Sequence, residues 1–177
     1  MKRILVFLLT LVLVLSFSAC GSSETPQTTA ATEVQTAATK TLEQAIRSYL
    51  DAMIFSRQAL IDQLVFDGWP EQEAADAIDS AAIDWNAQAL ASAGLSAEIS
   101  CLSQSGMTET LINEGFTKEE ADYAVENCSA DWMANAALSA ENHLSYVTLS
   151  RAEMIAQLES EGFTHEQAVY GADQNDL

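Results

Sequence analysis

A short phrase that occurs three times constrains the fold of this chain more than any other feature. Each copy has an acidic residue, a glycine, an aromatic residue and a residue that starts helices. The copies are Asp67-Gly68-Trp69-Pro70, Glu114-Gly115-Phe116-Thr117 and Glu161-Gly162-Phe163-Thr164, so the glycines recur every 47 residues. A left-handed glycine commonly ends a helix, and proline or threonine commonly opens the next one. The phrase therefore predicts a helix, a tight turn and a second helix in each copy.

Further identities at the same spacing define a tandem repeat. A serine, a leucine and an alanine are also identical in all three copies: Ser56, Ser103 and Ser150; Leu64, Leu111 and Leu158; Ala74, Ala121 and Ala168. We expect the serines to be helix N-caps, the leucines to lie on apolar helix faces and the alanines to allow close helix packing. We expect the aromatic residue after each glycine to pack on the preceding helix. Trp85 and Trp132 keep the spacing too, and we expect them at the seams between repeats.

The predicted fold class is all-α, with three tandem 47-residue helical repeats. Each repeat is expected to contain a longer helix, a short helix, the glycine-aromatic turn and a second short helix, because no stretch alternates convincingly as a strand. We place repeat 1 at residues 41–85, repeat 2 at 86–132 and a C-terminally truncated repeat 3 at 133–177. A unit of this size buries little apolar surface alone, so neighbouring repeats are expected to share a core.

Residues 1–19 are predicted to be a lipoprotein signal peptide. Lys2 and Arg3 precede an apolar run over residues 4–15, and small residues lead to Cys20, which is the order found in secretory signals. Cys20 would then be lipidated; the alternative is ordinary cleavage after Ala19 with an unmodified cysteine. Residues 20–40 are predicted to be a disordered linker. The protein would lie on the extracellular face of the bacterial cell membrane and touch that membrane only through its lipid.

The charge of the chain restricts its partners. It has 26 acidic and seven basic residues and a net charge of −19. Removing residues 1–19 takes away Lys2 and Arg3 and no acidic residue, so the mature chain would be at −21. Such a surface repels phosphate backbones, which argues against nucleic-acid binding, and favours basic partners. The charge therefore favours basic or cation-bearing partners.

The residues suited to chemistry form no catalytic or ligand motif. His143 and His165 lie outside any metal-ligand spacing and are expected on the surface. We therefore predict no metal, no cofactor and no enzymatic activity. Cys101 and Cys128 occur only in the second copy. They could form a disulfide outside the cell, or they could be two buried thiols that act as small apolar side chains.

The repeat resembles the Ltp family of host cell surface-exposed lipoproteins. The residues that carry the resemblance are Phe55-Ser56-Arg57, Leu60-Ile61-Asp62-Gln63-Leu64 and Gly68-Trp69, then residues 111–125 and 154–164, and the Asp-Trp pairs at 84 and 131. The resemblance implies prophage-encoded superinfection exclusion, in which a surface lipoprotein blocks DNA entry by binding a phage DNA-injection component. The alternative is a surface adhesion or sensing module unrelated to phage. If the turns lie along one edge, we expect Asp67, Glu114 and Glu161 to form an acidic partner-binding row.

Overall fold

The computed structural model describes residues 41–177. The predictions for the signal peptide, for Cys20 and for the linker fall on residues 1–40 and lie outside the described residues. Between residues 41 and 177 the chain forms nine α-helices and no strand. None of these helices has the length and the apolar character needed to cross a membrane.

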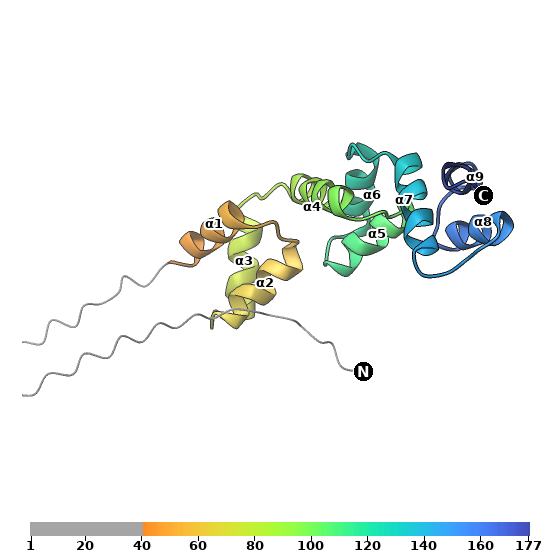
Figure 1. Ribbon diagram of the computed structural model, residues 1–177. Coiled ribbons are helices and arrows are strands. Elements are labelled where there is room, and N and C mark those ends of the chain that lie inside the picture. The colour runs from red at the N-terminus through yellow and green to blue at the C-terminus, as the bar shows by residue number, and fades with distance from the viewer. Residues whose placement is uncertain (1–40) are drawn as a thin grey trace, which may run out of the picture. The chain divides into compact units, whose positions relative to one another are not determined.

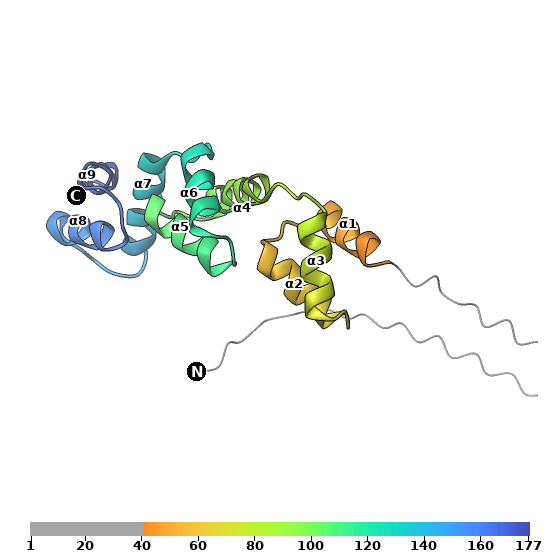
Figure 2. The same cartoon turned by 180° about the vertical axis from the view of Figure 1, so that it is seen from behind.

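The helices form three triplets that follow the repeat (Figures 1 and 2). They are α1 (Leu42–Ala52), α2 (Arg57–Phe66) and α3 (Glu71–Ser80); α4 (Trp85–Ile99), α5 (Gln104–Asn113) and α6 (Lys118–Asn127); and α7 (Trp132–Leu144), α8 (Arg151–Ser160) and α9 (His165–Gln174). The all-α fold with three tandem repeats is thus confirmed. The third repeat contains all three of its helices. Because Asp84 and Asp131 cap α4 and α7, these helices begin one residue before the predicted boundaries.

The glycine-aromatic turn ends the middle helix of each repeat in the same way. Gly68, Gly115 and Gly162 have φ values of +99°, +94° and +88°, which L side chains rarely adopt. The amide of the following aromatic residue donates to the backbone oxygen of the leucine five residues earlier, as Phe116 N does to Leu111 O at 3.1 Å. A second backbone hydrogen bond, from the glycine amide, completes a Schellman motif. The expected role of the glycines is confirmed.

Side-chain caps start most of the helices at the expected residues. Ser56, Ser103 and Ser150 are the N-caps of α2, α5 and α8. Thr117 and Thr164 form capping boxes at the starts of α6 and α9. The first copy differs, because it has proline where the other two have threonine. Pro70 occupies the N-cap of α3 and makes no side-chain cap, because proline lacks a side-chain acceptor, so it favours the helix start only through its fixed φ.

Each repeat has its own apolar core. Leu64, Leu111 and Leu158 are completely buried, as are Met107 and Met154 one turn earlier on their helices. The repeated alanines Ala74, Ala121 and Ala168 are completely buried as well. They lie on the third helix of each triplet, where their small side chains let it approach the core closely. Apolar packing within each triplet is therefore what stabilises the individual repeat.

Aromatic side chains extend these cores towards the seams. Phe116 and Phe163 are 5% and 4% exposed and pack in the cores of their own repeats, and Trp69 packs on the first core. Trp85 begins α4 but packs against the core of repeat 1, and Trp132 begins α7 but packs against that of repeat 2. The predicted positions of the aromatic residues are confirmed. Each tryptophan links a repeat to the one before it.

Hydrogen bonds at equivalent positions also join consecutive repeats. The hydroxyl of Ser56 donates to the backbone oxygen of Glu114 at 2.7 Å, and Ser103 donates to that of Glu161 at 2.6 Å. The long helices add one amide contact at each seam: Phe55 N donates to Gln88 Oε1, and Asn135 Nδ2 donates to Leu102 O. Ser56 and Ser103 are 2% exposed. A buried donor left unpaired is costly, so these bonds fix one arrangement at each seam.

One exposed ion pair recurs in the outer repeats. Arg57 pairs with Asp79 and Arg151 pairs with Asp173, both at 2.7 Å. The same positions in repeat 2 hold Gln104 and Glu126. We expect Gln104→Arg to add the missing pair and to raise the melting temperature by about 1–2 °C, since exposed pairs contribute little. Calorimetry at low and high salt checks this. An increase that is equal in both salts would contradict an electrostatic origin.

Candidate functional site

The acidic residue before each glycine lies at the C-cap of the middle helix. Its position follows from the local sequence, because the helix must end at the left-handed glycine that comes next. The three C-caps are Asp67, Glu114 and Glu161. Their backbone amides belong to the turn, and the backbone oxygens of Glu114 and Glu161 accept the bonds that join consecutive repeats. The carboxylates make further contacts.

In each repeat this carboxylate accepts a hydrogen bond from the longer first helix. Tyr49 donates to Asp67 Oδ2 at 2.6 Å in repeat 1, and Ser92 donates to Glu114 Oε2 at 2.6 Å in repeat 2. In repeat 3 the donor is Ser139, at 2.9 Å from Oε2. Each carboxylate thus ties the turn to the first helix of its own repeat.

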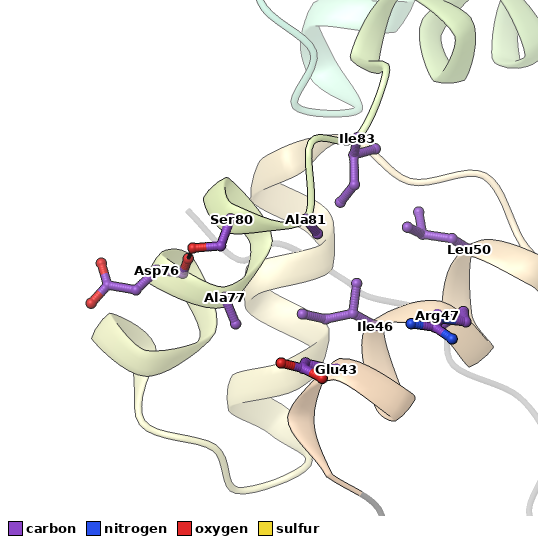
Figure 3. A pocket seen from close by; sticks show the side chains of 9 residues that line it. All are labelled: Glu43, Ile46, Arg47, Leu50, Asp76, Ala77, Ser80, Ala81 and Ile83. Carbon is purple, nitrogen blue, oxygen red and sulfur yellow. Dashed lines mark hydrogen bonds between the residues drawn. The ribbon is translucent and has the colours of Figure 1, made fainter.

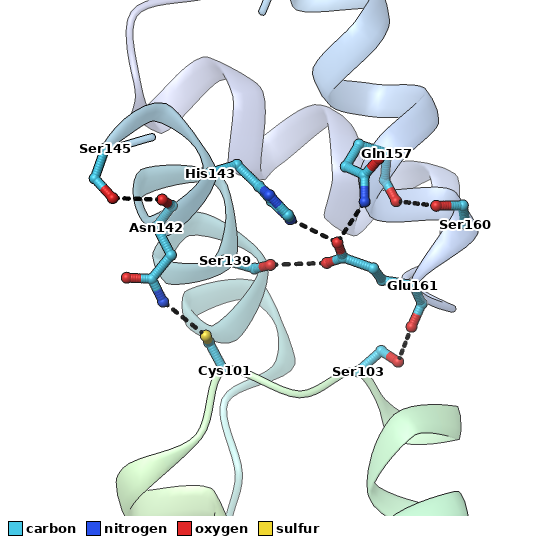
Figure 4. A network of polar contacts seen from close by, with 9 residues as sticks. All are labelled: Cys101, Ser103, Ser139, Asn142, His143, Ser145, Gln157, Ser160 and Glu161. Carbon is cyan, nitrogen blue, oxygen red and sulfur yellow. Dashed lines mark hydrogen bonds and ion pairs between the residues drawn. The ribbon is translucent and has the colours of Figure 1, made fainter. Parts of the chain in front are cut away.

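Repeat 3 has the most complete network around its carboxylate. Figure 4 shows His143 and Gln157 directed at the same oxygen of Glu161, at 2.5 and 2.7 Å, while Ser139 holds the other oxygen. The backbone oxygen of Glu161 accepts the bond from Ser103 across the seam. The expectation of a surface His143 was too simple, since its side chain is 31% exposed and bonded. One residue therefore connects two repeats and three helices.

These contacts change the acidity of the carboxyl group. Partial burial raises the pKa of Glu161, but hydrogen bonds from Gln157, Ser139 and His143 outweigh burial and lower the pKa below its ordinary value of 4.5. In repeat 1 the bond to Asp67 is the main cause that raises the pKa of Tyr49 above its ordinary value of 10.0. The two networks hold the carboxylate charged and the phenol protonated.

The lowered pKa of Glu161 predicts a pH-dependent stability. A carboxyl group with a lower pKa in the folded state contributes stability above its ordinary pKa of 4.5 and loses it as the pH falls through the folded pKa. We expect Glu161→Gln to lower the free energy of unfolding at pH 7 by about 1 kcal/mol, after allowance for solvent screening. The deficit should shrink from pH 4.5 downwards. Urea titrations at several pH values check this, with Glu141→Gln on α7 as a control.

Two hollows lie beside these helices. One, of about 550 Å³, lies between α1 and α3, where Ile46, Leu50 and Ile83 meet the charged residues Glu43, Arg47 and Asp76 (Figure 3). The corresponding residues of α4 and α7 include Ala93 and Ala140, which are completely buried, because small residues let paired helices approach closely. The other, of about 310 Å³, contains Ser56 and Glu114 at the first seam.

The cysteines lie apart from the acidic turns. Both Cys101 and Cys128 are half-buried free thiols in the structure. Asn142 Nδ2 lies 3.1 Å from the sulfur of Cys101, and the thiol of Cys128 donates to Val125 O at 3.4 Å. The Cys101–Cys128 disulfide stays a prediction, and intact mass under reducing and non-reducing conditions checks it. Residues 41–177 contain no group of three His, Cys, Asp or Glu side chains placed to hold a metal ion.

The repeat pattern identifies the acidic residues but not the side chains that bind them. Tyr49, Ser92, Ser139 and His143 all lie on the first helices, at two positions of the repeat that differ between copies. Identity at a fixed spacing cannot find such positions. A signal that could find them is a helix position that holds a polar side chain in each copy although the residue type changes, as at Tyr49 and His143.

Fold and site together define an acidic protein of tandem three-helix repeats. The residues that are identical in all three copies form its turns, cores and seams. The sequence profile of the host cell surface-exposed lipoproteins matches residues 38–80, 84–128 and 131–174. The chain belongs to this family, because the match covers more than half of it and falls once on each repeat. Comparison with the curated proteins and with the solved structures gave no match.

Proposed function

We propose that this protein acts in superinfection exclusion, by binding a protein component of the DNA-injection apparatus of an incoming phage at the cell surface. The observation that carries the proposal is the match of all three repeats to a family of surface-exposed lipoproteins. The net charge of −19 supports a basic protein partner and disfavours nucleic acid. The acidic residues at the turns face solvent in part, so they are available to steer such a partner.

The proposed activity is binding and not catalysis. The serines with the strictest spacing would be the first candidates for a nucleophile, yet Ser56 and Ser103 already cap helices and donate across the seams. A hydroxyl committed to two structural bonds is poorly placed to attack a substrate. This assignment supports a binding module that needs no cofactor and no metal.

We further propose that lipid on Cys20 holds the protein at the outer face of the membrane. Lipidation needs the thiol, so Cys20→Ser should move most of the protein from the membrane fraction to the medium. Fractionation with an antibody against the repeats checks this. Ala19→Gly, which keeps the cysteine and a small neighbour, is the matched control. Membrane retention of the serine variant would contradict a lipid anchor.

A phage challenge tests the proposed function itself. Cells that express the protein should adsorb a related phage normally but fail to take up its DNA, and the Cys20→Ser variant should protect them much less. Adsorption counts and labelled phage DNA measure the two steps separately. Unchanged infection by every related phage would contradict the proposal. It would favour the alternative function, a surface adhesion or sensing module.

A further inference from the structure

The three acidic turns differ in how completely their carboxylates are bonded. In repeats 1 and 3 both carboxylate oxygens accept hydrogen bonds, for example at Glu161 from Ser139 and from His143 with Gln157. Gln63 and Tyr49 serve the two oxygens of Asp67. Among residues 41–177, Glu114 accepts a side-chain bond only at Oε2, from Ser92. Its other oxygen has no donor there.

The repeat explains why Glu114 has an unfilled oxygen. The positions that hold His143 and Gln157 in repeat 3 are occupied in repeat 2 by Ser96 and Thr110. Serine is too short to replace the imidazole, and the hydroxyl of Thr110 instead donates to Gly106 O at 2.9 Å on its own helix. Repeat 2 therefore has the acceptor but lacks the two long donors that satisfy it in repeat 3.

A hollow adjoins this carboxylate at the seam of repeats 1 and 2. It measures about 310 Å³, and its wall combines Glu114, Ser56 and Ser92 with the apolar side chains of Ile54, Ala59 and Phe116. We call it the Glu114 hollow. Phe116 is buried and Ile54 is half-buried against the same core, so the apolar part of the wall is packed against the interior of repeat 2. One charged acceptor beside a firm apolar wall suits a ligand with a cationic head and an aliphatic stem.

We propose that the Glu114 hollow binds a lysine or arginine side chain of a partner protein. The ammonium or guanidinium group occupies the place at Glu114 that His143 and Gln157 fill at Glu161, and the methylene stem lies on Ile54 and Phe116. Charge-assisted bonds of this kind are stronger than neutral ones, and long basic side chains readily cover apolar surface with their stems. The net charge of −19 draws the cation in. The inference deepens the proposed partner binding and rests on it.

Butylguanidinium, which carries the head and stem of an arginine side chain, is the probe. We expect it to cause saturable NMR shifts at the amides of Ser92, Glu114 and Phe116 when added to the isotope-labelled full chain in non-ionic detergent at low salt. Glu114→Gln should weaken this binding about tenfold. Glu109→Gln on the same α5 helix removes an equal charge away from the hollow and should change it little. Equal weakening by both variants, or no shift at the hollow, would overturn the proposal.

A second variant supplies the missing hydrogen-bond donors to the Glu114 carboxylate from the protein itself. Ser96→His with Thr110→Gln rebuilds around Glu114 the donors of repeat 3 and should lower the affinity for butylguanidinium about tenfold without loss of thermal stability. Undiminished binding by a folded double variant would overturn the proposal. The titration needs no phage, so its failure differs from a failure of exclusion. A chain that binds the probe here but does not protect cells would contradict the proposed function alone.

Discussion

Replacing Gly115 with alanine is expected to lower the free energy of unfolding by about 2–3 kcal/mol, part of it through the contact between repeats. Gly115 has φ +94°, so any side chain there is strained by about 1–2 kcal/mol. A Cβ at this position would also lie 2.7 Å from the hydroxyl oxygen of Ser56. That hydroxyl caps α2 and donates to Glu114 O, so displacing it removes about 1 kcal/mol more.

The repeat supplies a matched control for this substitution. Gly68 has φ +99°, but a Cβ there would meet no atom within 4 Å. Gly68→Ala should therefore cost only the backbone strain, about 1–2 kcal/mol. Urea unfolding followed by circular dichroism measures both. Hydrogen exchange should also show that Gly115→Ala, and not Gly68→Ala, reduces protection at the start of α2. Equal costs would mean that the seam contributes nothing to stability.

Truncating Leu111 to alanine should cost about 2–5 kcal/mol and unfold the middle repeat first. Its side chain is completely buried in the core of repeat 2 with Met107 and Phe116. The loss combines the transfer free energy of the removed carbons with the cavity that remains. Because the repeat is small, a loss of this size removes most of its stability, and the outer repeats lose a neighbour on which their seams depend.

Ile112→Ala is the control for Leu111→Ala. Ile112 is the next residue on α5 and is 43% exposed, so its truncation should cost well under half as much. Urea unfolding gives the overall loss, and hydrogen exchange resolved by residue assigns it to a repeat. Protection that falls evenly across α1 to α9 would show that the three repeats unfold as one unit, which would contradict the expected order.

Leu111 and Gly115 stabilise different parts of the molecule, the inside of one repeat and the contact between two repeats. Leu111 stabilises one repeat from inside, where apolar packing dominates, while Gly115 acts where repeats meet through hydrogen bonds of Ser56 and Glu114. At the seams these hydrogen bonds fix how the repeats are arranged, beside the apolar contacts of Trp85 and Trp132. The seam bonds give Ser56 and Ser103 a structural role, while Ser150 serves as the cap of α8.

Much of the fold could be predicted because its causes are local. Glycine at a left-handed helix end, Thr117 and Thr164 as caps, and a leucine on each apolar face act within a few residues. Three copies at one spacing then corrected any ambiguity in a single copy. The caps Asp84 and Asp131 act in the same local way, since they set the starts of α4 and α7 at the tryptophans that follow them.

The site could be predicted only in part, because its contacts join residues far apart in the chain. The sequence predicted Glu114 and Glu161 as members of an acidic partner-binding row, but it did not predict that their carboxylates bond to Ser92 and to Ser139 with His143. Their backbone oxygens also accept bonds from the preceding repeat. The side-chain partners cannot be read from spacing, because their positions vary between copies. Spacing marks Ser56 and Ser103 as caps but does not show which distant oxygen each one meets.

By itself, the sequence determined the all-helical class, the triplet of helices and the glycine turn, since propensity, capping and apolar periodicity are short-range effects. Only the tertiary structure shows what the residues that are identical in all three copies do at the seams. It shows that Ser56 and Ser103, besides capping helices, bond to the next repeat. It also shows that the three acidic residues at the turns have different hydrogen-bond partners. The physical reason is that a hydrogen bond depends on where two distant groups come to lie, and only packing of whole helices sets that distance.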